Sequence, residues 1–497
     1  MPIMTLSGKP DCCWNATAPQ TTYPRLRGST SADVTVIGAG IVGLTTAYLL
    51  AKAGLSVAVL EARRVGRQVT GRSTAKITSQ HALIYRHLTE TLGLDKAQRY
   101  ADANRAGVRQ ICRWIDELNI ACELERKDAY TYTCDAALRD DMAAEVKAAK
   151  RVGFDAELLE RAPLPFDTAG AMRFPDEAQF NPTKYLIGLA AAAEAAGCRI
   201  FENTLVTAVD PKARWRATTK EGSLDVRHVV LATNLPFAGP IEYDGRTQPR
   251  CHIAMAFRMA PAAAIDGMFI GIDDPTHSLR MGHDREGPLL IVLGPRFNTG
   301  QDGNVAERFR QLETWTRTNL RAGEAAWRWV NEDYETADRV PFVGAPSGKA
   351  PGFYIATGFN GWGISNGTAA GLLIADLIQG RSNPWEALYA ADRASPEDLP
   401  ESNEPEQPSS IDDIGPGQGG VIEVGKQKLA VWKDDEGRAH AVAADCTHKG
   451  CPVTWNNAER TWDCPCHGSM FQVDGQVIHG PAVEPLAPID LAKIGLA

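Results

Sequence analysis

Two short segments near the end of the chain carry cysteines and histidines at a spacing that could bind metal. Residues 446–451 read CTHKGC, and residues 464–469 read CPCHGS. A Cys-x-His segment followed by a Cys-x-x-His segment offers two thiolates and two imidazoles from adjacent loops. The candidate ligands are Cys446, His448, Cys464 and His467.

Two kinds of metal site use this mixture of ligands. In a [2Fe–2S] cluster of mixed ligation, two cysteines hold one iron and two histidines hold the other, which raises the reduction potential above that of all-cysteine clusters. The alternative is one structural zinc ion in a Cys₂His₂ tetrahedron. Zinc alone does not account for Cys451 and Cys466, which occupy matching places in the two segments. We therefore expect the cluster, with the cysteine pair on one iron and the histidine pair on the other.

A second chemical signal lies near the start of the chain, where glycines separate a buried strand from a helix. Residues 34–61 read VTVIGAGIVGLTTAYLLAKAGLSVAVLE. Gly38 allows the tight turn, Gly40 lets a pyrophosphate approach the backbone, and Gly43 lets the helix pack closely on the sheet. The helix N-terminus offers N–H groups to the phosphates. Glu61 ends the second strand and is placed to accept hydrogen bonds from a ribose.

This fingerprint predicts a dinucleotide, but FAD and NAD both use the fold. The sequence contains a single fingerprint of this kind. A reductase that binds both FAD and NAD(P) would show a second one, so we expect FAD here and no NAD(P) domain.

The elements that must position these groups form two blocks joined by a linker. Strands and helices alternate in the first block, with strands expected at 34–37, 56–60, 199–201, 206–209 and 228–233, helices at 100–118 and 183–197, and a strand, glycine loop and helix over 352–378. Residues 393–410 mix prolines with acidic residues, which predicts a linker. The block after it, residues 411–497, is short and rich in strand signals.

Residues 31–385 resemble the D-amino-acid oxidase/glycine oxidase class of FAD-dependent oxidoreductases. The matching segments are 70–76 (TGRSTAK), 231–234 (LATN), 338–344 (DRVPFVG), 352–358 (GFYIATG) and the loop 359–365 (FNGWGIS), which opens a helix. The resemblance implies that this loop directs N–H groups toward flavin N1 and O2, where negative charge collects on reduction. A plain helix start is the structural alternative.

The fingerprint and the resemblance together assign a set of FAD-binding residues: Gly38, Gly40, Gly43, Glu61, Ala62, Gly71, Ser73, Thr74, Ala75, Lys76, Val206, Thr233, Asn234, Gly358, Asn360, Gly361, Trp362, Gly363 and Ile364. Some class members attach FAD covalently through Cys or His. The sequence has no Cys near Tyr334 and no His between Glu61 and His81. We therefore expect FAD to be bound non-covalently.

The two metal-binding segments resemble those of Rieske [2Fe–2S] proteins, and residues 480–482 (GPA) resemble the loop that covers a Rieske cluster. The resemblance implies a disulfide between Cys451 and Cys466 and a hydrogen bond from Ser469 to a bridging sulfide. High-potential members place a tyrosine where this chain has Phe471. We therefore expect a lower potential here. Lys449 is a candidate docking charge.

Substrate recognition departs from part of the class. Members that oxidise N-methyl amino acids carry a lysine in the flavin-covering loop, at a position where this chain has Ser365. The cations that could bind a substrate carboxylate instead are Lys76, Arg250 and Arg280. The histidines considered as bases are His81, His87 and His252, although a single histidine is more often structural. We assign no catalytic residue.

Composition excludes several other classes of protein. The chain has 497 residues, of which 44% are hydrophobic and 23% charged, with a net charge of -9. This is typical of a globular protein of two to three domains, and the negative charge disfavours nucleic acid and anionic membranes as partners. The sequence shows neither a signal peptide nor an apolar membrane span. We therefore expect a cytoplasmic protein.

The expected fold is α/β plus all-β: an N-terminal segment (1–30), a Rossmann-like FAD domain with an inserted antiparallel substrate sheet (31–392), a linker (393–410) and a small β Rieske domain (411–497). FAD-binding parts are expected at about 31–110, 195–240 and 335–385. The resemblance implies oxidation of a small amine or amino-acid-like substrate by hydride transfer to FAD. Electrons would then pass through the cluster to an external protein or quinone. The alternatives are inward flow from a donor, for substrate reduction or O₂ activation, and a mainly electron-transferring protein.

Overall fold

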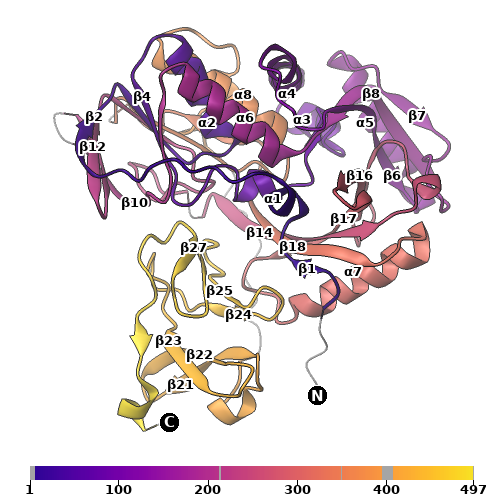
Figure 1. The fold of residues 1–497 in the computed structure, drawn as a ribbon. Helices are drawn as coiled ribbons and strands as arrows, with labels where there is room; N and C mark the ends of the chain where they lie inside the picture. The colour runs from indigo at the N-terminus through magenta and orange to yellow at the C-terminus, as the bar shows by residue number, and fades with distance from the viewer. Residues whose placement is uncertain (1–5, 212–213, 244, 349, 395–406, 496–497) are drawn as a thin grey trace.

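The computed structural model describes residues 6–211, 214–243, 245–348, 350–394 and 407–495. A large α/β lobe comes first in the chain, and a smaller lobe of β-structure, yellow in Figure 1, packs beneath it. This arrangement confirms the expected fold class. Most of the expected linker, residues 395–406, lies outside the described residues.

A six-stranded sheet forms the nucleotide-binding core of the large lobe. Its order is β19 (Phe342–Gly344), β20 (Phe353–Thr357), β13 (His228–Leu231), β3 (Val34–Ile37), β4 (Val57–Leu60) and β9 (Arg199–Phe201). All its strand pairs are parallel except β19 with β20. Every residue of β3 and β4 is buried, as expected for strands with both faces covered. A four-stranded sheet lies beside this core: β10 (Val206–Pro211), β11 (Trp215–Thr219), β12 (Gly222–Val226) and β2 (Gly28–Ser31).

The inserted sheet has ten strands, and all but two of its strand pairs are antiparallel. Its main path is β1 (Lys9–Pro10), β18 (Ala325–Thr336), β14 (Thr247–Arg258), β17 (Gly287–Asn298), β16 (Ser278–Asp284), β15 (Met268–Gly271), β6 (Glu125–Thr133), β8 (Gly170–Gln179) and β5 (Lys76–Ile77), and β7 (Glu157–Leu159) pairs with β8. The helix α7 (Val305–Leu320) packs on β14 and β17. Strand side chains alternate between faces, so the other face of these strands is directed toward the core sheet.

The remaining helices cover the core sheet and the far end of the antiparallel sheet: α1 (Cys13–Thr17), α2 (Ile41–Lys52), α3 (Ile84–Thr91), α4 (Leu94–Glu117), α5 (Arg139–Arg151), α6 (Pro182–Ala195), α8 (Gly363–Ile378) and α9 (Glu386–Tyr389). The helix α2 packs against both α6 and α8, as Figure 1 shows. Within the described ranges, no helix combines the length and the apolar character needed to cross a bilayer.

The small lobe contains two four-stranded sheets. One is β21 (Gly419–Val424), β22 (Gln427–Lys433), β23 (Ala439–Ala443) and β28 (Pro488–Ile489), and the other is β24 (Thr454–Asn456), β25 (Thr461–Asp463), β26 (Met470–Phe471) and β27 (Val477–His479). Trp455 and Trp462 pack together in its core with a ring separation of 4.8 Å.

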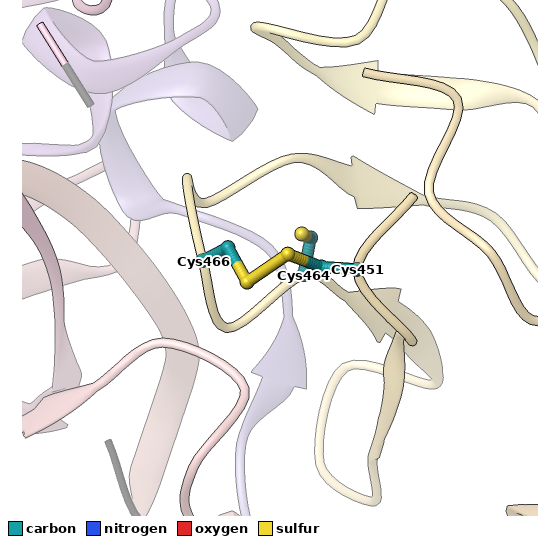
Figure 2. A group of neighbouring side chains, drawn as sticks. All are labelled: Cys451, Cys464 and Cys466. Atoms are coloured by element: carbon teal, nitrogen blue, oxygen red, sulfur yellow. A yellow bond between two sulfur atoms is a disulfide. The ribbon is translucent and has the colours of Figure 1, made fainter. Parts of the chain in front are cut away.

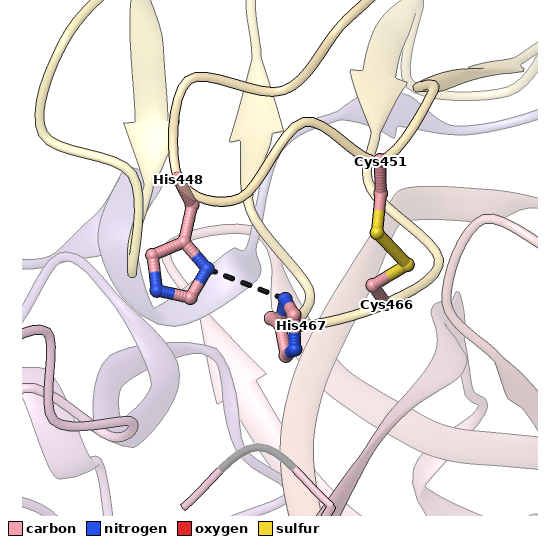
Figure 3. Close-up of a disulfide and its surroundings, with 4 residues drawn as sticks. All are labelled: His448, Cys451, Cys466 and His467. Carbon is pink, nitrogen blue, oxygen red and sulfur yellow. Dashed lines mark hydrogen bonds between the residues drawn. A yellow bond between two sulfur atoms is a disulfide. The ribbon is translucent and has the colours of Figure 1, made fainter. Parts of the chain in front are cut away.

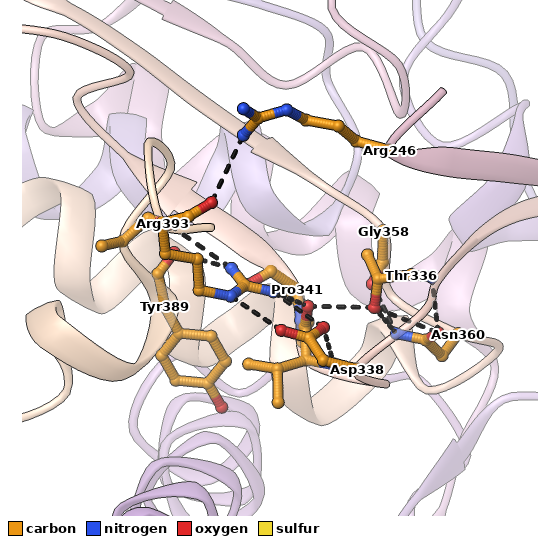
Figure 4. A network of polar contacts seen from close by, with 10 residues as sticks. Arg246, Thr336, Asp338, Pro341, Gly358, Asn360, Tyr389 and Arg393 are labelled. Atoms are coloured by element: carbon orange, nitrogen blue, oxygen red, sulfur yellow. Dashed lines mark hydrogen bonds and ion pairs between the residues drawn. The ribbon is translucent and has the colours of Figure 1, made fainter. Parts of the chain in front are cut away.

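A polar network lies at the C-terminal end of the large lobe, just before the linker (Figure 4). Arg393 donates to both carboxylate oxygens of Asp338, at 2.9 and 3.0 Å, and to the carbonyl of Pro341. Its guanidinium also lies 3.9 Å from the ring centroid of Phe342. Because the Arg393 and Asp338 side chains are only 14% and 10% exposed, this contact fixes the chain end to the segment that leads into β19 and β20.

Candidate functional site

A cavity of about 880 Å³ lies between the core sheet and the antiparallel sheet. The carboxyl ends of β3, β4 and β13 open into it, which is where a doubly wound sheet binds a nucleotide. Nearly all the residues assigned to FAD from the sequence line this cavity. The exceptions are Gly43, Gly71 and Gly358, which pack behind its wall.

The fingerprint glycines have the geometry that a nucleotide cradle requires. Gly38 has a φ of +106°, and a Cβ placed there would lie 2.4 Å from the carbonyl oxygen of Ala232. A Cβ at Gly43 would lie 1.9 Å from the carbonyl oxygen of Gly38, and one at Gly71 would lie 1.7 Å from that of Gly66. Contacts this short exclude any side chain without movement of the backbone. The turn after β3, the close approach of α2 to that turn and the packing at residue 71 therefore each require glycine.

Glu61 lies at the cavity wall, where burial raises the pKa of its carboxyl group. Its two oxygens accept hydrogen bonds from the backbone N–H groups of Ala39, at 2.8 Å, and Arg63, at 2.9 Å. The carboxylate therefore holds the glycine turn to the end of β4. Its contact with a ribose remains a prediction.

The loop before α8 is shaped by two left-handed residues, Asn360 with a φ of +56° and Gly361 with a φ of +82°. The Asn360 side chain accepts from the backbone N–H of Thr336, at 2.9 Å, and donates to the carbonyl of Gly358, at 2.6 Å. Gly361 donates its backbone N–H to Asp333 at 2.5 Å. The Asn360 side chain thus fixes the loop, while the residues around it line the cavity.

The three cations considered for a substrate carboxylate differ in their surroundings. Arg280 is buried beneath the cavity wall, donates to the carbonyls of Ala75 and Phe180, and stacks on Trp14. Arg250 pairs with Glu335 at 3.3 Å. Lys76 lines the cavity, and burial together with nearby Arg280 lowers the pKa of its amine to about 7. Of the three, Lys76 is the one that lines the cavity, and its amine donates to the carbonyl of Phe269 and the hydroxyl of Ser278.

The three candidate histidines differ in their contacts and in their positions relative to the cavity. His81 stacks on Trp362, contacts the Tyr100 hydroxyl at 2.8 Å and the Ser365 hydroxyl at 3.0 Å, and burial lowers its pKa to about 3. These contacts give His81 a structural role in positioning the Trp362 loop. His87 is absent from the cavity wall, whereas His252 lines it, and burial lowers the pKa of His252 to about 4.

The four candidate metal ligands come together at one end of the small lobe. Cys446 and Cys464 are both buried and belong to the same core cluster of the small lobe. The Nδ1 atoms of His448 and His467 lie 3.3 Å apart (Figure 3). Two buried thiols beside two imidazoles provide the mixed donor set of a [2Fe–2S] cluster with two-cysteine, two-histidine ligation, so these residues fit the group.

A disulfide joins the two ligand loops, as the resemblance implied. Cys451 and Cys466 are bonded at 2.09 Å. Figure 2 shows the Cys464 sulfur beside this bond, and the three sulfurs lie within 4.8 Å of one another. Because the sulfurs of Cys451 and Cys466 are already bonded to each other, the three cysteines are not a separate metal site. The disulfide instead supports the loop that carries Cys464. Ser469 is fully buried, and its hydroxyl accepts from the backbone N–H of Ala482 at 2.9 Å.

The small lobe completes the cavity, which sequence reasoning did not anticipate. Residues 477–483 line it, and Arg63 and Gln68 of the large lobe donate to the carbonyls of Val477 and Ile478 at 3.0 and 3.3 Å. Lys449 contacts Glu242 at 2.7 Å, so the charge interpreted as a docking group for another protein pairs within the chain.

Strands β14, β17 and β18 of the inserted sheet direct polar side chains into the cavity. Besides His252, which the sequence had suggested, these are residues that the sequence did not single out: Arg296, Asn331, Asp333 and Glu335. Burial raises the pKa of Asp333 to about 7, and its Oδ1 atom is buried without a hydrogen-bond partner in the structure. The only sequence signal for these residues is the alternation of side chains along each strand. This alternation does not show which face lines the cavity when both faces are covered.

Comparison with known proteins agrees with this geometry. The family model for FAD dependent oxidoreductases (DAO) matches residues 33–377, and that for the Rieske [2Fe-2S] domain matches residues 408–490. YhfW of Bacillus subtilis (strain 168), whose name provisionally assigns it to the Rieske 2Fe-2S iron-sulfur proteins, is 31% identical over 97% of this chain and 98% of its own length.

Two further similarities cover the large lobe. The gamma-glutamylputrescine oxidoreductase of Escherichia coli (strain K12) is 24% identical over 74% of this chain and 88% of its own length. The crystal structure of L-proline dehydrogenase from P. horikoshii shares the fold, with a TM-score of 0.60 and 20% identity over 74% of this chain and 98% of that one. The chain therefore belongs to the DAO family of FAD-dependent oxidoreductases and carries a C-terminal Rieske [2Fe–2S] domain.

Proposed function

We propose that the protein oxidises a small amine or amino-acid-like substrate in the large lobe and passes the electrons through its own Rieske domain to an external one-electron acceptor. The observation that carries the proposal is the shared wall: the Rieske segment 477–483 lines the same cavity as the FAD-binding residues. The loop that bears His467 is hydrogen-bonded to Tyr334 of the large lobe at 2.8 Å.

The proposed oxidation balances in atoms and electrons. When bound, FAD accepts hydride and the cluster carries single electrons. The substrate loses a hydride from the carbon beside its nitrogen and a proton from that nitrogen, which leaves an imine for water to hydrolyse. The two electrons then leave one at a time, either to two equivalents of a one-electron redox protein or to one quinone that takes up both, and the reduced flavin releases its proton. The protein's own residues bind and orient the substrate and exclude water.

The cavity wall supports a substrate that carries both a positive and a negative group. Lys76 is a cation on β5 and Asp333 is a carboxyl group on β18, whereas Glu335 is already paired with Arg250 and Arg296. Burial shifts the pKa values of Lys76 and Asp333 to about 7, so binding of an oppositely charged group would ionise each of them. This pairing suits an amine with a carboxylate elsewhere in the molecule.

An anaerobic assay tests the proposal on the holoprotein. The relatives' names supply two starting probes, gamma-glutamylputrescine and L-proline, to which other small amines are added. We expect at least one amine to bleach the flavin absorbance, followed by the EPR signal of the reduced cluster. A flavin that bleaches only after the cluster has been reduced by an added reductase would reverse the direction of flow and overturn the proposal.

Phe471 provides a prediction about the cluster itself. This ring is fully buried and packs in the same core as Cys446 and Cys464. A tyrosine hydroxyl there would need a hydrogen-bond partner, and a ligand sulfur is the nearby acceptor. Since each 1.4 kcal/mol is worth about 60 mV for one electron, we expect Phe471→Tyr to raise the cluster potential by tens of mV.

An EPR-monitored redox titration checks this, with the flavin potential of the same sample as the internal control. Equal cluster potentials in the two proteins would contradict the prediction.

A further inference from the structure

Strand β18 lies between the FAD cavity and the Rieske loop that carries His467. Successive side chains of a strand point to opposite faces. Asn331, Asp333 and Glu335 line the cavity on one face. Glu332 and Tyr334 are buried on the other face, against the Rieske domain.

The Rieske domain approaches this face of β18 very closely. A Cβ at Gly468, the residue after His467, would lie 2.4 Å from Oε1 of Glu332 and 2.7 Å from the hydroxyl of Tyr334. His479 reaches the same strand, with Nε2 3.3 Å from Oε2 of Glu332. The absence of a side chain at Gly468 therefore lets the ligand loop rest directly on the strand.

Of the adjacent residues Asp333 and Tyr334 of β18, the first contacts the flavin loop and the second contacts both sites. On the cavity side, the Asp333 carboxylate accepts a hydrogen bond from the backbone N–H of Gly361 at 2.5 Å. The carbonyl of Tyr334 accepts one from the backbone N–H of Asn360 at 3.0 Å. On the cluster side, the Tyr334 hydroxyl donates to the carbonyl of His467 at 2.8 Å. The loop assigned to the flavin and the loop assigned to the cluster are thus joined through one tyrosine.

Other contacts fix the lobes to each other without reaching a ligand residue. They include Arg72 with Glu459 at 3.0 Å, Thr454 with the carbonyl of Gly300 at 2.7 Å, and Asn457 with the backbone N–H of Ala306 at 2.9 Å. Unlike these contacts, the hydrogen bond from Tyr334 ends on a candidate ligand.

We propose that Tyr334 is a positioning residue for electron transfer: it holds the His467 loop against the flavin loop, so that electrons cross a fixed interface inside the chain. Electron transfer then requires no swinging of the Rieske domain. This inference rests on the proposed function, because it presumes that electrons pass between the two sites. Each crossing oxidises the flavin by one electron and reduces the cluster by one.

The variant Tyr334→Phe tests the inference because it removes the hydroxyl and keeps the ring. It leaves the buried carbonyl of His467 without this donor, so the ligand loop loses its fixed position. After anaerobic bleaching of the flavin, we expect cluster reduction to slow roughly tenfold, the effect of losing about one buried hydrogen bond. Bleaching itself should keep its rate. The EPR spectrum of the chemically reduced cluster should broaden, and amide hydrogen exchange over residues 464–469 should speed up.

Tyr243→Phe is the matched control. Tyr243 is also buried and also donates to a backbone carbonyl at 2.8 Å, that of Ala391, within the large lobe. This variant should leave cluster reduction, the EPR spectrum and exchange over 464–469 unchanged.

The outcomes separate the inference from the proposed function. If the wild-type flavin bleaches and its cluster is then reduced, but Tyr334→Phe matches wild type in rate, spectrum and exchange, the positioning role is wrong and the relay stands. If the wild-type cluster stays oxidised after the flavin bleaches, electrons do not pass from the flavin to the cluster. The proposed function is then wrong, and so is the role of Tyr334 in electron transfer.

Discussion

Replacing Gly43 with alanine should weaken FAD binding at least roughly tenfold while leaving the Rieske cluster in place. The new methyl group would start 1.9 Å from the carbonyl oxygen of Gly38 and 3.2 Å from Cγ1 of Val36, so α2 would have to move away from the glycine turn. The same turn is fixed from the other side by Glu61, whose carboxylate accepts the N–H of Ala39. Because overpacking of this kind costs about 1–3 kcal/mol or more, and the strain falls on the phosphate-binding turn, we expect FAD affinity to fall at least roughly tenfold.

The flavin and cluster absorbances of the purified protein measure this result together. The cluster signal is the internal control, because the candidate ligands lie in the other lobe. Gly348→Ala is the matched variant: a Cβ at Gly348 would have no heavy atom within 4 Å, and Gly348 is not among the glycines with positive φ. It should retain both cofactors. A Gly43→Ala protein with full flavin content would show that the close approach of α2 is not needed.

The nucleotide-binding part of the site could be predicted from the sequence because its signals are local. Gly38, Gly40 and Glu61 lie within one strand–helix–strand unit, and each type of residue has a physical reason to be there. The two ligand segments are local in the same sense, because the residue types and spacing define the donor set. The structure gathers most of the fingerprint residues at the cavity and the candidate ligands in the small lobe, and their individual roles in binding FAD and iron stay predictions.

The contact between the lobes could not be predicted in this way. Arg63 and Val477, which join across it, are 414 residues apart in the chain. Tyr334 and His467 are 133 residues apart. Each of these residues is ordinary in its own segment, and its role depends on which surface of β18 the small lobe covers. Lys449 shows the same limit, since its charge suggested a docking group but pairs with Glu242.

Removing the cluster should leave substrate oxidation intact and stop electrons from leaving. Cys464 is fully buried, lies beside the disulfide and packs in the same core as Cys446, so Cys464→Ala removes a ligand that no neighbour can replace. The disulfide sulfurs of Cys451 and Cys466 are already bonded to each other. We expect iron and the cluster EPR signal to be lost and flavin content to remain.

Steady-state reduction of a one-electron acceptor should then fall at least about 100-fold under anaerobic conditions, since loss of an outer partner alone can cost 10–100-fold. Bleaching of the flavin by the same amine in a single turnover should keep its wild-type rate. The two measurements separate the chemistry at FAD from the export of electrons. Cys198→Ala, which removes another buried free thiol far from both ligand segments in the chain, is the control and should change neither.

Electron transfer from the flavin to the cluster also predicts the redox state of the flavin in Cys464→Ala. Without a cluster, the reduced flavin should accumulate during turnover, because the acceptor can no longer withdraw single electrons through the Rieske domain. The flavin absorbance should therefore stay bleached while substrate is present, whereas in the wild type it should recover as acceptor is consumed. An iron-free variant that still reduces the acceptor at the wild-type rate would mean that electrons leave directly from the cavity. In that case the Rieske domain would serve as a structural wall of the FAD site, to which residues 477–483 already contribute.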